Sequence, residues 1–176
     1  MKYQNRDSQQ TLREGLAEYY AAFPTLDRFT EDDSRIIAKT FMAHDAVHVI
    51  TGMDISPESE IILDTWQFWA TYPGQDFWDS MRVTKEIFSD REFNQRIKDI
   101  LTASSLKDWL WWLGQCFIPC CKAIAFSWQM TKKWHTYDFQ NYLDVPLVDI
   151  RAEYKIKVMQ QGETALIPNP SMNDQL

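Results

Sequence analysis

Apolar residues recur every three to four positions along most of the chain, and no stretch shows the strict alternation of a half-buried strand. This helical period restricts the fold more than any other feature. Only five glycines and seven prolines are present to interrupt helices in 176 residues. Since 45% of the residues are hydrophobic, the chain can bury a core. We therefore expect an all-α fold, a single domain over residues 1–176 formed by a bundle of about six to eight helices.

Residues typical of helix starts and helix ends divide the helical pattern into separate helices. Thr30 precedes three acids and is typical of an N-cap, and Gly52 is a typical helix end. Ser56 followed by Pro57 predicts the next helix start. The tail 160–176 has little apolar content and we expect it to be loose. The predicted helices cover approximately residues 8–23, 30–52, 56–72, 76–89, 91–101, 104–130 and 144–154.

The segment 104–130 is the most apolar part of the chain, with a length close to that of a membrane-spanning helix. Gly114, Gln115, Pro119 and Lys122 interrupt it. These residues favour a kinked core helix, while an interfacial membrane contact and a spanning helix are the alternatives. Three cysteines lie in the same segment, and their odd number favours reduced core thiols over disulfides; they are Cys116, Cys120 and Cys121.

The net charge and the N-terminal residues restrict the binding partners and the cellular location that we expect. The formal net charge is −7 and there is no basic run, which argues against nucleic acid as a partner. The first ten residues lack the apolar region of a secretion signal. We therefore expect a cytoplasmic, bacterial protein.

Two of the three histidines, His44 and His48, are spaced i, i+4, which places both rings on one face of a helix. Asp45 lies next to the first of them. Glu60 falls near the start of the following helix, which a short connection could fold back along the first. Two imidazoles with carboxylates suit zinc, iron or manganese better than calcium. We predict one divalent metal ion between the second and third helices, with His44, Asp45, His48 and Glu60 as ligands.

Three other interpretations compete with this metal site. The first is a set of polar side chains that only form hydrogen bonds inside a helical core. The second is a metalloprotease, but Asp45 is one methylene shorter than the glutamate of an HExxH site. The third is a phosphohydrolase built on a His-Asp pair, which needs further histidines, and only His135 remains.

The stretch HDAVHVITGMDISPESE, residues 44–60, resembles the signature of the coenzyme Q (ubiquinone) biosynthesis protein four family. That signature has a His-Asp-x-x-His pair, a glycine, and a glutamate twelve positions after the second histidine. A closing segment, Val148 to Ile156, also resembles the family. KTFMAHD stands where the family has an arginine- and tyrosine-rich run.

The resemblance implies a zinc-associated, all-α protein that handles polyprenylated quinone precursors. It implies a role in quinone biosynthesis, and the family is linked to C1 decarboxylation of the ring, either as a lyase or as an oxidative decarboxylase. Its implied partners are other quinone-biosynthesis proteins and the surface of the inner membrane, where the protein would be peripheral. Magnesium, manganese and iron are the alternatives to zinc.

A prenyl tail needs apolar lining, and the aromatic residues of the third helix and of the segment 104–130 are candidates for it, with ordinary core packing as the alternative for each residue. The predicted lipid-binding residues are Trp66, Trp69, Trp109, Trp112 and Phe117.

Two hypotheses about the function follow. One is a metal-dependent enzyme that acts on a prenylated benzoquinone precursor. The other is a non-catalytic prenyl-lipid-binding or scaffold protein with a structural metal. A homodimer is compatible with both.

Overall fold

The computed structural model describes residues 1–24, 26, 36–72 and 117–159, which are helical and contain no β-strand. The expected all-α fold is confirmed for these ranges. The predicted helices at 76–89 and 91–101, the tail from 160 and the first part of the segment 104–130 lie outside them. The elements in chain order are the 3-10 helix η1 (Lys2–Gln4), α1 (Leu12–Ala22), α2 (Ile36–Thr51), α3 (Pro57–Ala70), α7 (Ile118–Trp128), the 3-10 helix η3 (Thr136–Tyr142) and α8 (Leu147–Tyr154).

The ends of these helices follow local chemistry. Thr11 caps α1, and its hydroxyl accepts a hydrogen bond from the backbone of Glu14. Gly52 ends α2 with a φ of 76°, a left-handed conformation that glycine adopts without strain. Ser56 caps α3 as predicted, and its hydroxyl accepts from the backbone of Ser59.

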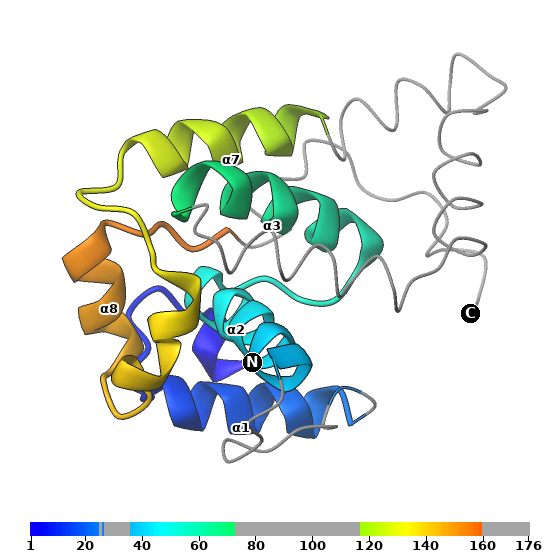
Figure 1. Cartoon of the computed structure of the whole chain (residues 1–176), viewed down its shortest axis with the longest axis vertical. Helices are drawn as coiled ribbons and strands as arrows, with labels where there is room; N and C mark the ends of the chain where they lie inside the picture. The colour runs from blue at the N-terminus through cyan, green and yellow to red at the C-terminus, as the bar shows by residue number, and fades with distance from the viewer. Residues whose placement is uncertain (25, 27–35, 73–116, 160–176) are drawn as a thin grey trace, which may run out of the picture.

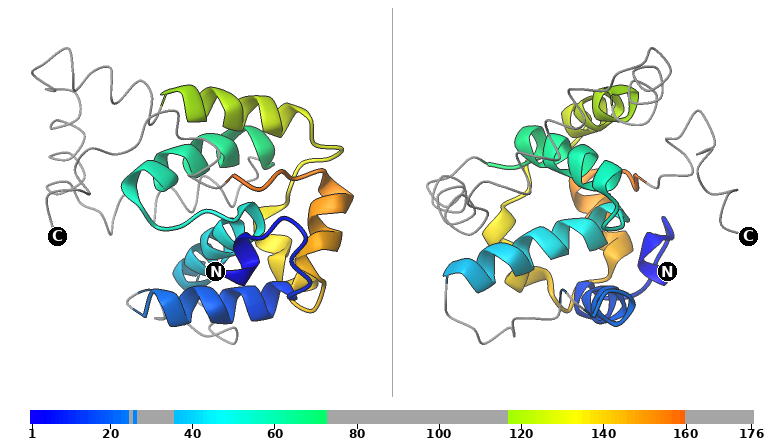
Figure 2. Two further views of the ribbon diagram at one scale, coloured as in Figure 1. Left: turned by 180° about the vertical axis from the view of Figure 1, so that it is seen from behind. Right: turned by 90° about the vertical axis from the view of Figure 1, so that its right-hand side faces the viewer.

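Helix α2 lies at the centre of the described part. Figure 1 shows it between α1 on one side and the pair α3 and α7 on the other, while α8 packs near its end (Figures 1 and 2). Residues 45–53 are all buried, so this half of α2 has no solvent face. Helices α3 and α7 lie side by side in each view, and the end of α3 is tied to the segment after α7 because Trp134 donates its backbone N–H to Ala70 O at 2.9 Å.

Helices α1 and α2 approach each other closely at Gly15. A methyl group there would lie 2.5 Å from Cγ1 of Val49, which is closer than carbon atoms can pack. The absence of a side chain at this position therefore sets the distance between the two helices. The core around this contact is formed by α1, α2, α3 and α8 together with η1, η3 and Trp134. Its largest fully buried side chains include Trp66, Trp134, Tyr3, Tyr19, Phe139, Leu12 and Ile50.

Arg151 of α8 is 5% exposed, and its guanidinium donates hydrogen bonds to backbone carbonyls of two other segments. Two of these carbonyls belong to the last turn of α2, where helix geometry leaves them without intrahelical partners. The others belong to the N-terminal segment. The five acceptors are Val49 O, Ile50 O, Tyr3 O, Asn5 O and Arg6 O, at 2.6–3.3 Å.

The two described cysteines are free thiols, as predicted, but only one of them contacts the core. Cys120 is partly buried and packs against the core, whereas Cys121 is exposed on α7. Cys116 lies outside the described residues.

We expect Arg151→Met to lower the free energy of unfolding by more than about 3 kcal/mol, because it leaves several buried carbonyls without a donor. Urea denaturation measures this loss. Arg13→Met is the control: Arg13 pairs with Asp144 at 2.9 Å on the exposed surface, so its loss should cost less than about 1 kcal/mol. Equal losses for the two variants would contradict the role given to Arg151.

Candidate metal centre

Helix α2 brings two imidazole rings together. His44 and His48 are one turn apart, and their Nε2 atoms lie 3.2 Å from each other. The side chain of His48 is 1% exposed and that of His44 is 29% exposed, so the pair extends from the interior toward the surface. This difference in exposure between the two rings follows from the burial of the second half of α2.

Glu60, at the start of α3, faces both rings. Its Oε2 lies 3.2 Å from His44 Nε2, and its Oε1 lies 3.2 Å from His48 Nε2. The start of α3 is held in place by Asp54, whose carboxylate accepts hydrogen bonds from the backbone and hydroxyl of Ser56 and from the hydroxyl of Ser59. This network fixes the first turn of the helix and thereby the position of Glu60. We call His44, His48 and Glu60 the triad.

The side chains of the triad lie close enough to share one small divalent ion. In a tetrahedral site with bonds of about 2.0–2.1 Å, neighbouring ligand atoms are about 3.3–3.4 Å apart. The two Nε2 atoms lie 3.2 Å apart, and each lies 3.2 Å from a different oxygen of Glu60. With one ligand atom taken from each residue, the three atoms lie within 4.8 Å of one another. The triad could therefore hold one divalent ion, and three ligands leave at least one position for water or a substrate oxygen. This arrangement agrees with the predicted site between the second and third helices.

The charges in the triad favour one bound proton. Burial alone would lower the pKa of His44, but its hydrogen bond to Glu60 and the charge of that carboxylate raise the pKa to about 9. Burial alone would raise the pKa of Glu60, but hydrogen bonds to both histidines lower it to about 2. Burial lowers the pKa of His48. At neutral pH a cationic His44 thus faces an anionic Glu60, and an entering ion must displace the proton on His44.

Zinc affinity should therefore rise with pH. A raised His44 pKa means that the competing proton is present at neutral pH and is lost only as pH passes about 9. We expect the Kd for zinc to fall about tenfold per pH unit between about pH 7 and pH 8.5, with about one proton released per ion. Calorimetry in buffers of different ionisation enthalpy measures both quantities. An affinity that does not change with pH would contradict the protonated state of His44.

Asp45 contacts a different partner from the one predicted. Its Oδ2 accepts a hydrogen bond from the hydroxyl of Tyr20 at 3.0 Å, and the side chain is 7% exposed. One residue corresponds to about 100° around a helix, and this turns Asp45 toward α1. The same helix stacks the ring of Tyr19 on His48, with centroids 5.5 Å apart and planes at 27°. The structure thus brings together three of the four predicted ligands, with Asp45 beside them and its pKa raised to about 6 by burial.

Substitutions at the two carboxylates should separate their roles. Because Asp45 faces Tyr20, Asp45→Asn should change the zinc Kd by less than about threefold. Glu60→Gln removes a charged ligand and should weaken binding by more than about 100-fold. Competition with a chromophoric chelator measures both constants. If Asp45→Asn weakens binding as much as Glu60→Gln, Asp45 is a ligand after all.

Two polar residues of α3 near the triad were missed by sequence reasoning. Gln67 Oε1 lies 3.3 Å from the second ring nitrogen of His44, Nδ1. The charges of the triad also act on Asp64, an exposed residue of α3. Both follow Glu60 on one face of the helix, at i+4 and i+7, and this periodicity is the signal that could have identified them.

The predicted lipid-binding residues lie in different environments. Trp66 is 1% exposed and packs in the core, as the alternative interpretation had it. Trp69 is 40% exposed and Phe117 is 51% exposed. Trp109 and Trp112 lie outside the described residues.

Trp69 belongs to an exposed aromatic cluster on α3 and α7, together with Phe68 and Trp128. Its ring centroid lies 5.4 Å from that of Phe68 and 6.1 Å from that of Trp128. Trp69 follows Glu60 by nine residues, which places it on the opposite side of α3. Trp69 therefore does not line the triad.

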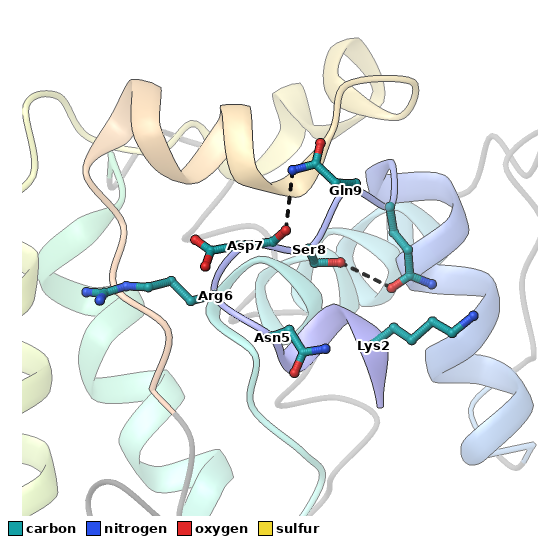
Figure 3. Close-up of a pocket in the computed structure, with 7 residues that line it drawn as sticks. Lys2, Asn5, Arg6, Asp7, Ser8 and Gln9 are labelled. Carbon is teal, nitrogen blue, oxygen red and sulfur yellow. Dashed lines mark hydrogen bonds between the residues drawn. The ribbon is translucent and has the colours of Figure 1, made fainter.

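A surface hollow of about 650 Å³ lies elsewhere, along the N-terminal segment. Its basic side chains, Lys2 and Arg6, point in different directions and do not converge on a common point (Figure 3). No triad residue contributes to the hollow. Its lining consists of Lys2, Asn5, Arg6, Asp7, Ser8, Gln9 and Gln10.

Comparisons of the chain with protein-family models, with curated proteins and with solved structures find no match. Among the described helices, none has the length and apolar character needed to cross a membrane.

Proposed function

We propose that the chain binds a divalent metal ion, zinc in the first place, and presents it to the carboxylate or hydroxyl group of a polyprenylated quinone precursor. The convergence of the triad at 3.2 Å separations supports the metal part of this proposal. The likeness of residues 44–60 to the coenzyme Q biosynthesis protein four signature supports the substrate class.

When bound, zinc would act as a Lewis acid that polarises an oxygen of the substrate. The chain's own residues would supply the shape and charge of the site. Glu60 offsets part of the charge of the ion, and the buried His48 and the ring of Tyr19 exclude water from its inner side. The more exposed His44 marks the side from which a substrate can approach. The proposed reaction class is C1 decarboxylation of the aromatic ring.

The exposed cluster of Phe68, Trp69 and Trp128 supports contact with a membrane surface more than it supports a lipid-binding groove beside the metal. Indole rings are favoured at the boundary between lipid and water. Because Trp69 lies on the side of α3 opposite Glu60 and all three side chains are exposed, the cluster suits contact of the protein with a bilayer that holds prenylated lipids. This observation also favours the second candidate, a non-catalytic prenyl-lipid binder in which the metal only joins α2 to α3.

Substitution of His48 tests the proposal. His48→Ala should lose bound zinc by elemental analysis and weaken zinc binding by more than about 100-fold, because it removes a buried ligand. His135→Ala is a matched control, since this exposed histidine stacks on Tyr72 and lies outside the triad. Full metal content in His48→Ala would remove the proposed site.

Turnover separates the two candidates. An enzyme should release carbon dioxide from a prenylated hydroxybenzoic acid, and His48→Ala should abolish this release while His135→Ala retains it. A lipid binder should retain prenylated lipid, detected by mass spectrometry after organic extraction, and show zinc-dependent thermal stability without turnover. Activity of metal-free His48→Ala equal to that of the wild type would exclude a metal-dependent enzyme.

A further inference from the structure

His44 contacts α3 through both of its ring nitrogens. Nε2 lies 3.2 Å from Glu60 Oε2, and Nδ1 lies 3.3 Å from Gln67 Oε1. Gln67 follows Glu60 by seven residues, so the two side chains leave the same face of α3 two turns apart, about 10 Å along its axis. The ring of His44 lies between them, with one nitrogen facing each side chain.

The contact with Gln67 selects the tautomer of His44. An amide oxygen only accepts hydrogen bonds, so the Nδ1 atom that faces it carries the hydrogen. A neutral imidazole with its hydrogen on Nδ1 has its free electron pair on Nε2, the atom that faces Glu60 and His48. We propose that Gln67 is a positioning residue of the metal site, which fixes the tautomer and the ring plane that His44 needs as a ligand. The inference rests on the proposed metal-binding function.

The rings of the two histidines are kept in position by different contacts, so Gln67 is important for only one of them. His48 is enclosed by the core and by the stacked ring of Tyr19, and among the described residues its Nδ1 has no hydrogen-bond partner. Packing therefore holds His48. His44 is 29% exposed, so packing restricts its ring less, and a second hydrogen bond is needed to orient it.

Gln67 itself lies on a rigid part of α3. Its backbone carbonyl accepts hydrogen bonds from the backbone N–H and the hydroxyl of Thr71, at 3.0 and 2.8 Å. The end of the helix is tied to Trp134 through Ala70. A positioning group on a fixed helix can hold a ligand more accurately than one on a loop.

Three variants test this role through the zinc Kd, measured by competition with a chromophoric chelator. Gln67→Met keeps the size of the side chain but removes the acceptor, and should bind zinc about 10–100-fold more weakly. Gln67→Glu keeps an acceptor and should bind within about threefold of the wild type or more tightly. Gln129→Met makes the same change at the exposed end of α7 and should leave the Kd unchanged.

Nitrogen-15 NMR spectra of the histidine rings report which ring nitrogen carries the hydrogen. This position would not depend on Gln67 if its role were purely structural. In zinc-loaded wild-type protein, the hydrogen of His44 should be on Nδ1, and its signal should exchange faster with water in Gln67→Met. Hydrogen on Nε2 in the wild type would overturn the inference whatever the variants do.

The binding outcomes distinguish this inference from the proposed function. If the wild type binds no zinc, the metal site and the role of Gln67 fail together. If the wild type binds zinc and Gln67→Met binds it equally well, only the role of Gln67 fails. If Gln67→Met does not fold, Gln67→Glu still tests the role of Gln67. This variant keeps a hydrogen-bond acceptor, so zinc binding more than about tenfold weaker than in the wild type would contradict the role.

Discussion

The guanidinium of Arg151 joins three segments that are distant in sequence, and the geometry of the triad depends on this contact. It donates to the last carbonyls of α2, where the helix dipole places partial negative charge, and to the N-terminal segment. The end of α2 is thereby fixed, and Gly52 turns the chain at that point. Only a short connection then leads to Ser56 and α3. An error in the position of this end would displace Glu60 from the two histidines.

The carboxylate of Glu60 has a cationic partner in two different states of the triad. With a proton on His44, the cation and the carboxylate of Glu60 neutralise each other, and His48 is neutral in the core. With a divalent ion, the proton would leave, the two Nε2 atoms and a carboxylate oxygen of Glu60 would become ligands, and Glu60 would offset one of the two charges of the ion. Because the three side chains already face one another, this exchange requires little movement of the backbone. Glu60 is therefore not left as an unpaired charge in either state.

The sequence predicted the helical fold and the triad because both depend on local spacing. Two histidines four residues apart share a helix face, and a cap signal at Ser56 placed Glu60 one turn into the next helix. The partner of Asp45 was not predictable in this way, since Tyr20 belongs to α1 and lies 25 residues away in sequence. The contact of Gln67 with His44 depends on how α3 crosses α2, and spacing within one helix does not determine that angle.

The missing side chain at Gly15 has an effect beyond the packing of two helices. Tyr19 follows Gly15 by one helical turn on the same face of α1, and its ring stacks on His48. The next residue, Tyr20, donates to Asp45. A bulkier residue at Gly15 would push α1 outward and open a gap behind the ring of His48. Water could then reach the buried side of the triad, although the change lies in another helix and alters none of its residues.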